Sequence, residues 1–245
     1  MKEQDWKKLP WMKGVEVLIS GEDWVAVNKP AGVLSHPNGP KDADRAVLSL
    51  PWSDETEVFG APDGDFPEIR LCHRLDGPTS GILLLALADQ ADWFIKAFEE
   101  GRIHKTYRAV VAGRPRSRTF VWKDRLVRGN EEGKLRVRVG GNGMRAETAG
   151  SEVGFRRDGI PLSLLKLEPG TGRTHQIRVQ AAKHGLPIIG DRNYGDFGAN
   201  RAFRRKHSTQ RLFLHATELS WRREGRKIRV VSTPPEEFSE LFPNT

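Results

Sequence analysis

The stretch HRLDGPTSGILLLAL, residues 73–87, predicts a sharp turn followed by a buried strand, and it is the starting point for predicting the fold. Its first half holds two glycines within five residues and a proline, which favour a sharp turn of the backbone. Its second half is an apolar run of the length typical of a buried strand. The carboxylate of Asp76 is therefore expected in a turn directly before a core strand. It is a candidate nucleophile, base or metal ligand, and the plain alternative is that it only caps the turn.

Apolar segments on either side of this stretch predict further strands. They are short, apolar or alternating, and bounded by glycine, proline or charged residues. The expected strands are residues 15–20, 24–28, 106–112, 162–167, 212–221 and 228–232, and residues 120–139 are expected to form a basic hairpin that turns near Gly129-Asn130 or Glu132-Gly133.

Helices are fewer than strands in this sequence. Asp89 is a candidate cap for a helix that runs to Glu100, and Thr174 for a helix from His175 to about His184. Residues 37–68 contain five prolines and many acidic side chains, which predicts a long surface loop with room for one short helix near Asp44 to Leu50. Strands that do not alternate regularly with helices predict an α+β fold, with a mainly antiparallel mixed sheet flanked by a few helices and loops.

Length and composition indicate a globular protein. The 245 residues fit a polar N-terminal tail at residues 1–14 and a single domain at residues 15–245. No apolar stretch approaches the ~18 residues of a membrane span, and the first 21 residues lack the apolar core of a secretory leader. Cys72 is the only cysteine, which excludes an intramolecular disulfide and a four-thiolate zinc site. We expect a cytoplasmic protein and, in the absence of heptads, a monomer.

The charge is unevenly distributed along the chain. The net charge is +8, but residues 1–72 carry 8 Lys and Arg against 13 Asp and Glu, a balance of −5, which leaves +13 for residues 73–245. Nine basic residues lie between Arg173 and Arg211. Such a charge concentrates polyanions, which could be RNA, DNA or an acidic protein; the alternative is a solvated basic face.

Two further segments carry candidate functional residues. In KTYRAVV, residues 105–111, Tyr107 lies on a predicted strand, where it could stack on a planar ligand or simply belong to the core. In GTGRTHQIR, residues 170–178, a glycine-rich turn leads into a helix whose free N–H groups attract anions. Arg173 precedes this helix and Arg178 lies one turn inside it. An ordinary link between strand and helix is the alternative.

Metal and serine-hydrolase chemistry are disfavoured by spacing. The histidines and Cys72 show neither HxxxH nor CxxC spacing, so no metal site is predicted. Ser80 lies outside the G-x-S-x-G pattern of a nucleophile elbow.

Taken together, these segments resemble the RluA-type family of pseudouridine synthases, which modify uridines in ribosomal and transfer RNA. The resemblance rests on five segments in the family's order: VNKPAGVLSHP (27–37), HRLDGPTSGILLLA (73–86), KTYRAVVAG (105–113), GRTHQIRVQAAKHGLPIIGDRNYG (172–195) and RLFLHATEL (211–219). It covers about residues 15–232.

The resemblance implies a pseudouridine synthase fold and an isomerase that needs no metal or organic cofactor. It implies that Asp76 is the essential carboxylate, that Tyr107 stacks on the uracil and assists proton removal, and that Arg178 keeps the carboxylate ionised. The partner would be a stem-loop of rRNA or tRNA whose target base is flipped out. The residues expected to bind this substrate are Arg74, Ile177, Arg173, His73 and Thr79.

Two departures from the family pattern stand out. Gln180 occupies a position where the family often has histidine, and we expect this change to affect packing or RNA contact more than chemistry. The segment before residue 15 is too short for the RNA-binding module that many relatives carry, so we expect the catalytic domain itself to hold the RNA. The alternatives are a non-catalytic RNA-binding protein on the same fold and a base-releasing glycosylase. DNA binding is disfavoured by the lack of a helix-turn-helix or zinc-finger pattern.

Overall fold

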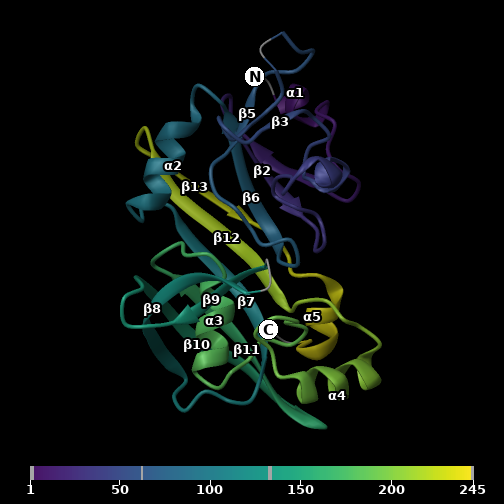
Figure 1. The fold of residues 1–245 in the computed structure, drawn as a ribbon, viewed down its shortest axis with the longest axis vertical. Helices are drawn as coiled ribbons and strands as arrows, with labels where there is room; N and C mark the ends of the chain where they lie inside the picture. Colours follow the sequence, from purple (N-terminus) through teal and green to yellow (C-terminus); the bar gives the residue numbers. More distant parts are fainter. Residues whose placement is uncertain (1–2, 62, 132–133, 244–245) are drawn as a thin grey trace. The chain divides into compact units, whose positions relative to one another are not determined.

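The chain folds into two compact units, each built around strands of its own. The structure, a computed structural model, describes residues 3–61, 63–131 and 134–243. The first unit comprises Met1–His104 with Ala216–Thr233, and the second comprises Lys105–His215 with Pro234–Thr245. Figure 1 shows the elements of both units, coloured along the sequence.

The apolar run after Asp76 forms β6 (Ser80–Leu87), the central strand of the first unit. It pairs antiparallel with β2 (Trp24–Lys29) and with β5 (Ile69–Leu71), and it neighbours β12 (Leu214–Arg223). Antiparallel hairpin partners extend this sheet on both sides, namely β1 (Glu16–Ser20) beside β2 and β13 (Arg226–Val231) beside β12. The predicted buried strand is thus confirmed, with the side chains of Ile82 to Ala86 fully buried.

A cluster of aromatic and aliphatic side chains fills the core of the first unit. Helix α2 (Ala91–Glu99) contributes Phe94 and Ala97, which are fully buried. The indole rings of Trp24 and Trp221 meet edge to face at 5.1 Å. Gly81 is required where β6 meets β12, because it has a φ of +113° and a Cβ there would lie 2.3 Å from the carbonyl oxygen of Ala216.

The segment predicted as a long surface loop contains regular structure. It includes a 3-10 helix η1 (Pro40–Arg45) and the short paired strands β3 (Trp52–Ser53) and β4 (Val58–Phe59). Val47, Leu48 and Phe59 are fully buried. A short helix was expected near Asp44 to Leu50, and η1 lies slightly earlier in the chain. The paired strands and the buried side chains were not predicted, because these apolar residues stand between prolines, where no periodicity indicates which side chains face the core.

The N-terminal segment packs against the first unit. Helix α1 (Glu3–Lys7) contains Trp6, which is fully buried and donates a hydrogen bond from Nε1 to the carbonyl oxygen of Gly21 at 3.0 Å. Trp11 donates in turn to the carbonyl oxygen of Trp6 at 2.9 Å. The two tryptophans therefore anchor this segment.

The second unit is an antiparallel sheet in the order β7-β11-β10-β8-β9. These strands are β7 (His104–Ala112), β11 (Ile160–Pro169), β10 (Met144–Asp158), β8 (Thr119–Glu131) and β9 (Lys134–Val139). The strand pairs named in both units are antiparallel, which confirms the predicted α+β class.

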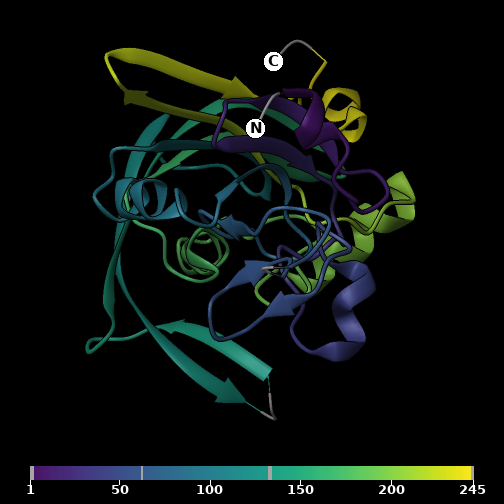
Figure 2. The same ribbon diagram turned by 90° about the horizontal axis from the view of Figure 1, so that it is seen from above.

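The predicted basic hairpin is formed by β8 and β9 and extends as a two-stranded ribbon (Figure 2). Gly129 and Asn130 lie within β8, paired with Arg136 and Leu135, so they do not form its turn. The other expected turn residues, Glu132-Gly133, lie outside the residues that the structure describes.

The described part of the second unit contains three helices, and the two helix caps predicted from the sequence, for α2 and for the first of these three, are not formed. They are α3 (Gln176–Lys183), α4 (Phe197–His207) and α5 (Glu236–Leu241). No side-chain cap is formed by Thr174 at α3, nor by Asp89 at α2, where Gln90 holds the capping position. Asp196 caps α4 instead, accepting a hydrogen bond from the backbone N–H of Ala199 at 2.7 Å.

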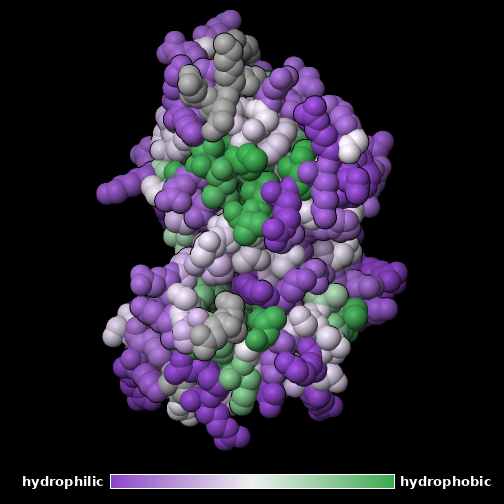
Figure 3. Space-filling view, turned by 180° about the vertical axis from the view of Figure 1, so that it is seen from behind, coloured by the Kyte–Doolittle hydropathy of each residue, from purple (hydrophilic) through white to green (hydrophobic). Residues whose placement is uncertain are grey.

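Polar and apolar side chains are distributed unevenly over the surface. In Figure 3, hydrophobic side chains gather on the visible face of the first unit, and the visible face of the second unit shows mostly hydrophilic residues. No helix among the described residues is long and apolar enough to cross a membrane.

Candidate active-site elements

Asp76 lies in the turn between β5 and β6, and backbone contacts fix this turn. The hydroxyl of Ser35 binds both the N–H and the carbonyl of Leu75, at 3.0 and 2.8 Å. The carbonyl oxygen of Asp76 accepts from the N–H of Thr79 at 3.0 Å, and that of Gly77 accepts from the N–H of Gly32 at 2.8 Å. The backbone on both sides of Asp76 is thus held in place, while the side chain is only partly buried.

Lys29 supports the same turn through hydrogen bonds to backbone carbonyls. Its fully buried ammonium group donates to the carbonyl oxygens of Val33, Pro30 and Gly77 at 2.6, 3.1 and 3.2 Å. Burial lowers the pKa of Lys29 to about 7, and the negative charge of Asp76 opposes that decrease. Three carbonyl acceptors match the three donors of the charged form, so this contact favours the ammonium ion.

Arg74 lies two residues before Asp76 and is exposed. Its guanidinium forms an ion pair with Glu57, which directly precedes β4 and has a positive φ of 55°. Both side chains are about half exposed, so the pair is accessible to a competing anion such as an RNA phosphate.

His73 and Thr79 have structural contacts in this turn. Nε2 of His73 accepts a hydrogen bond from the backbone N–H of Leu84 at 3.1 Å, and its ring lies 4.5 Å from that of Phe98. Thr79 is 2% exposed. These contacts tie the turn to β6, and substrate contact by either residue stays a prediction.

Tyr107, Ile177, Arg178 and Arg173 belong to the second unit. Tyr107 lies on β7 opposite Leu167 of β11 and is 9% exposed, while Ile177 lies in the first turn of α3 and is 7% exposed. Arg173 is exposed in the loop before α3. The candidate residues therefore form two sets, one on the turn before β6 and one on β7 and α3.

Arg178 is held by a buried carboxylate that the sequence analysis did not single out. Its Nε and Nη2 atoms donate to the two oxygens of Asp191 at 2.7 and 2.9 Å. Arg178 is 4% exposed and Asp191 is 1% exposed. Burial by itself raises the pKa of Asp191, but Arg178 and the backbone N–H groups of Tyr194 and Asn193 hold it below its usual value. The pair is therefore ionised and fixes the direction of the guanidinium.

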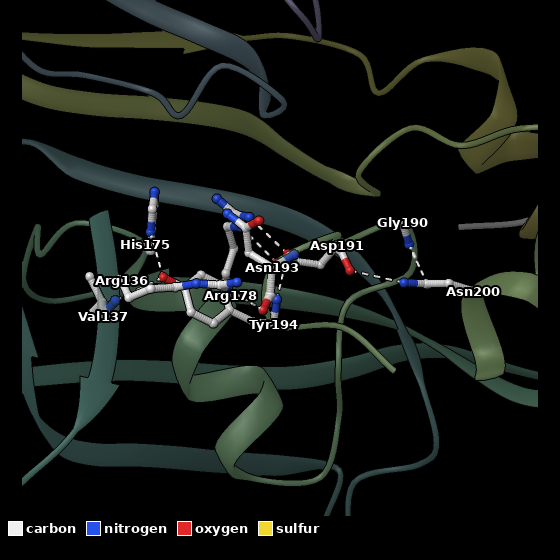
Figure 4. A network of polar contacts seen from close by, with 9 residues as sticks. All are labelled: Arg136, Val137, His175, Arg178, Gly190, Asp191, Asn193, Tyr194 and Asn200. Atoms are coloured by element: carbon white, nitrogen blue, oxygen red, sulfur yellow. Dashed lines mark hydrogen bonds and ion pairs between the residues drawn. The ribbon is translucent and has the colours of Figure 1, made fainter. Parts of the chain in front are cut away.

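A polar network continues from this ion pair (Figure 4). The guanidinium of Arg178 lies 5.2 Å from the ring centre of Tyr194, whose hydroxyl is hydrogen-bonded to Nδ1 of His175 at 2.8 Å and accepts from the N–H of Val137 at 3.1 Å. Burial raises the pKa of Tyr194. The network connects α3, β9 and the segment before α4, and it leaves Arg178 little freedom to move.

Two glutamines fasten α3 to the sheet. Gln176 accepts at Oε1 from the hydroxyl of Thr171 and the N–H of Arg173, at 2.7 and 3.0 Å, and so orders the loop before α3. Gln180 is fully buried, accepts from the hydroxyl of Thr148 at 2.7 Å and donates to Asp124 at 2.8 Å. Gln180 therefore takes part in the packing of α3 on the sheet, and an effect on RNA contact stays a prediction.

Lys29, Asp191 and Tyr194 were not proposed as functional from the sequence. The signal for Lys29 was its place in VNKPAG, and that for Asp191 and Tyr194 was their place in GDRNYG, both within segments that carried the family resemblance. Among the described residues, no three His, Cys, Asp or Glu side chains gather closely enough to hold a metal ion.

Comparison with known proteins identifies the family. The family model described as RNA pseudouridylate synthase matches residues 23–183. The chain belongs to this family. The match includes the turn that carries Asp76, Tyr107 on β7 and the whole of α3, and the RluA-type resemblance of the sequence is confirmed.

Curated relatives agree with the assignment to the pseudouridine synthases. The chain is 31% identical over 217 residues to "tRNA pseudouridine synthase C" of Vibrio parahaemolyticus, which covers 84% of this chain and 83% of the relative. It is 29% identical over 232 residues to "Ribosomal large subunit pseudouridine synthase D" of Zymomonas mobilis, covering 93% and 72%. The protein is thus an isomerase of the pseudouridine synthase family.

Solved structures of pseudouridine synthase domains share the fold. "Human RNA Pseudouridylate Synthase Domain Containing 4" has a TM-score of 0.68 at 24% identity and covers 93% of this chain and 92% of that one. "Human RNA Pseudouridylate Synthase Domain Containing 1" has a TM-score of 0.67 at 22% identity and covers 96% of each. The predicted pseudouridine synthase fold is confirmed.

Proposed function

We propose that the protein isomerises specific uridines in structured RNA, rRNA or tRNA or both, and that Asp76 is its catalytic carboxylate. The match of residues 23–183 to the family carries the proposal. The names of the relatives support both RNA classes, since one acts on tRNA and another on the large ribosomal subunit. We place the reaction in the cytoplasm, by a monomer that needs no metal ion.

The reaction breaks the bond between C1′ of the ribose and N1 of the uracil and forms a bond from C1′ to C5. The proton on C5 then leaves, and the freed N1 takes up a proton in exchange. The atoms of the RNA are conserved, so no redox partner, phosphoryl donor or water is consumed. An ionised Asp76 adds to the base or the sugar, or first abstracts a proton. The held backbone around Asp76 supports this role, because it fixes the carboxylate without burying it.

The other proposed roles follow from side-chain chemistry. Tyr107 stacks on the flipped uracil and assists proton removal from C5, and Ile177 supports the base. Arg178 favours the ionised carboxylate, and its buried pair with Asp191 supports this by fixing the guanidinium. Arg74, Arg173, His73 and Thr79 are the remaining proposed substrate contacts.

The decisive experiment replaces Asp76 with Asn, which keeps the size of the side chain and removes its negative charge. We expect Asp76→Asn to fold normally and to form no pseudouridine in bulk tRNA or rRNA, measured by chemical mapping of pseudouridine. Normal turnover would remove Asp76 from the mechanism. Intact mass of the RNA separates isomerisation, which leaves the mass unchanged, from a glycosylase, which releases the base.

The RNA target is tested in cells. Pseudouridine is mapped across total RNA from cells with and without the gene for this protein. The sites that disappear name the substrate, and a map without any change would contradict the proposed activity.

A further inference from the structure

A group of cations surrounds the loop before α3. It consists of Lys105 from β7, Arg128 from β8, Arg145 from β10 and Arg173 from the loop itself, and we refer to these four residues as the loop cation cluster. Arg128 donates from Nη2 to the hydroxyl of Thr174 at 2.6 Å. Nε of Arg173 donates to the carbonyl oxygen of Arg145 at 3.3 Å. The side chain of Arg128 on β8 thus reaches the loop, and β10 contributes the carbonyl oxygen that holds Arg173.

Lys105 lies directly under the loop. Its Nζ is 3.5 Å from the carbonyl oxygen of Thr171, and it would be 3.3 Å from a Cβ placed on Gly172. The ammonium group therefore lies close against the backbone of Gly172, and a side chain at that position would displace it slightly.

Positive charges lie close together in the loop cation cluster. Burial, and next the positive charge of Arg173, lower the pKa of Lys105 to about 8. The acidic partner in the cluster is Glu147, which pairs with Arg145 at 2.8 Å. Lys105 and Arg173 are thus like charges that the fold holds close together, which costs free energy.

The backbone of the loop adds to this positive potential. Gln176 orders the loop by accepting from Thr171 and Arg173, and the loop leads into the N-terminus of α3, where the helix dipole is positive. Ordered cations together with a helix N-terminus match a tetrahedral anion with several oxygens better than a single carboxylate.

We propose that the loop cation cluster is a binding site for a backbone phosphate of the RNA, with Lys105 and Arg173 as its central ligands. The proposal rests on the proposed function, since RNA supplies the phosphate. The bound phosphate would relieve the repulsion between Lys105 and Arg173, so the free energy that the repulsion costs in the free protein would be recovered on binding. This assigns Lys105 a role in binding that neither its position on a strand nor its neighbour Tyr107 indicated.

Binding of a fluorescein-labelled RNA stem-loop with a uridine-rich loop tests the site. Kd is measured from about 0.05 to about 0.3 M KCl, a range wide enough to resolve the dependence of log Kd on log salt. We expect Lys105→Gln and Arg173→Gln each to weaken binding about three- to tenfold and to reduce the slope of log Kd against log salt by about 0.7–0.9, the change for one lost phosphate contact. Lys105→Arg should retain the slope, because it keeps the charge.

The matched control is Lys227→Gln on β13, an exposed position outside the cluster that removes the same charge. We expect its affinity and salt slope to equal those of the wild type, and circular dichroism melting checks that each variant is folded. Unchanged slopes in folded Lys105→Gln and Arg173→Gln, or an equal loss in Lys227→Gln, would overturn the phosphate site.

The proposed function fails by a different result. A wild-type protein that forms no pseudouridine but shows the expected salt slopes would retain the phosphate site and contradict the activity. A wild-type protein that forms pseudouridine while the two Gln variants bind with unchanged slopes would retain the activity and contradict the site.

Discussion

At the scale of single residues, Asp191 shows how a buried carboxylate holds the guanidinium of Arg178 in one orientation. Both oxygens of Asp191 bind Arg178, and one of them also accepts from the N–H groups of Asn193 and Tyr194 at 2.9 and 3.0 Å. The carboxylate thus has four donors in a buried environment. Removing its charge would leave a buried guanidinium without this counter-ion.

We therefore expect Asp191→Asn to lower the free energy of unfolding by about 3 kcal/mol, as is usual when one partner of a buried pair is removed. Urea unfolding at pH 7 measures this. The depressed pKa of Asp191 means that the pair stabilises the fold above the unfolded-state pKa of Asp and that this contribution is lost as the pH falls through the folded-state pKa. The difference between wild type and variant should therefore shrink in acid, and a constant difference would contradict the ionised pair.

Tyr107 is the residue whose two proposed roles separate most cleanly. The ring stacks on the base, and the hydroxyl assists proton removal. Tyr107→Phe keeps the ring, so we expect RNA affinity within about twofold of wild type and a loss of most of kcat, of the order of the 10²–10⁴-fold typical of acid–base groups. Single-turnover kinetics with saturating enzyme measures it. A fully active variant would show that stacking alone is required.

At the scale of elements, α3 is positioned by glutamines rather than by an end cap. Gln180 bridges β10 through Thr148 and β8 through Asp124. Asp124 also contacts His184, 3.1 Å away, so one carboxylate holds both the middle and the end of the helix. Buried amides with satisfied hydrogen bonds specify register, because a slipped helix would leave them unpaired.

Gln180→Leu tests this positioning, since it keeps the approximate volume and removes the bonds. We expect it to lower the free energy of unfolding by about 1–3 kcal/mol, because the hydroxyl of Thr148 and the carboxylate of Asp124 lose a buried partner. Guanidinium unfolding measures the change. Gln210→Leu at an exposed glutamine is the matched control and should change stability by less than about 0.5 kcal/mol. Equal effects would show that the contacts of Gln180 contribute little.

Elements with regular periodicity were predictable from the sequence, and elements without it were not. The apolar run of β6 and the alternation of β7 and β11 indicated their strands, and the turn before β6 indicated Asp76. The short strands β3 and β4 were not predicted, because two-residue strands carry no periodic signal. They depend on the pairing of β3 with β4 and of β4 with β5.

The candidate site was predictable only in part, for a physical reason. Asp76, Tyr107 and Arg178 lie in segments with the family's motifs, so the resemblance found them. Lys29 is buried and donates to the carbonyl of Gly77, which lies 48 positions further along the chain. Asp191 is buried and pairs with Arg178, which lies 13 positions before it. Such partners are set by tertiary packing, which a single sequence does not display.

At the scale of the whole molecule, positive charge is concentrated on the second unit, which suits the proposed binding of RNA. The excess of +13 after residue 72 falls largely on the second unit, where α4 carries a basic last turn. Phe203 anchors this helix by packing on Phe213 at 5.2 Å between ring centres. Arg204, Arg205 and Lys206 are exposed on it. A rigid helix that displays three cations is suited to long-range attraction of a polyanion.

Replacing Arg204, Arg205 and Lys206 together with glutamine should therefore weaken RNA binding uniformly across sequences, without affecting the rate of the bound complex. We expect the salt slope of log Kd to fall by about 2, because up to three phosphate contacts are lost and each contributes about 0.7–0.9. Titration of labelled tRNA at several KCl concentrations measures the slope, and single-turnover rates at saturating enzyme measure catalysis. The basic residues also lie at the C-terminal end of the helix dipole, so a small loss of helix stability is expected and melting must be compared. A folded triple variant with the wild-type slope would mean that the RNA follows a different face of the protein, and the loop cation cluster would then have to supply the attraction alone.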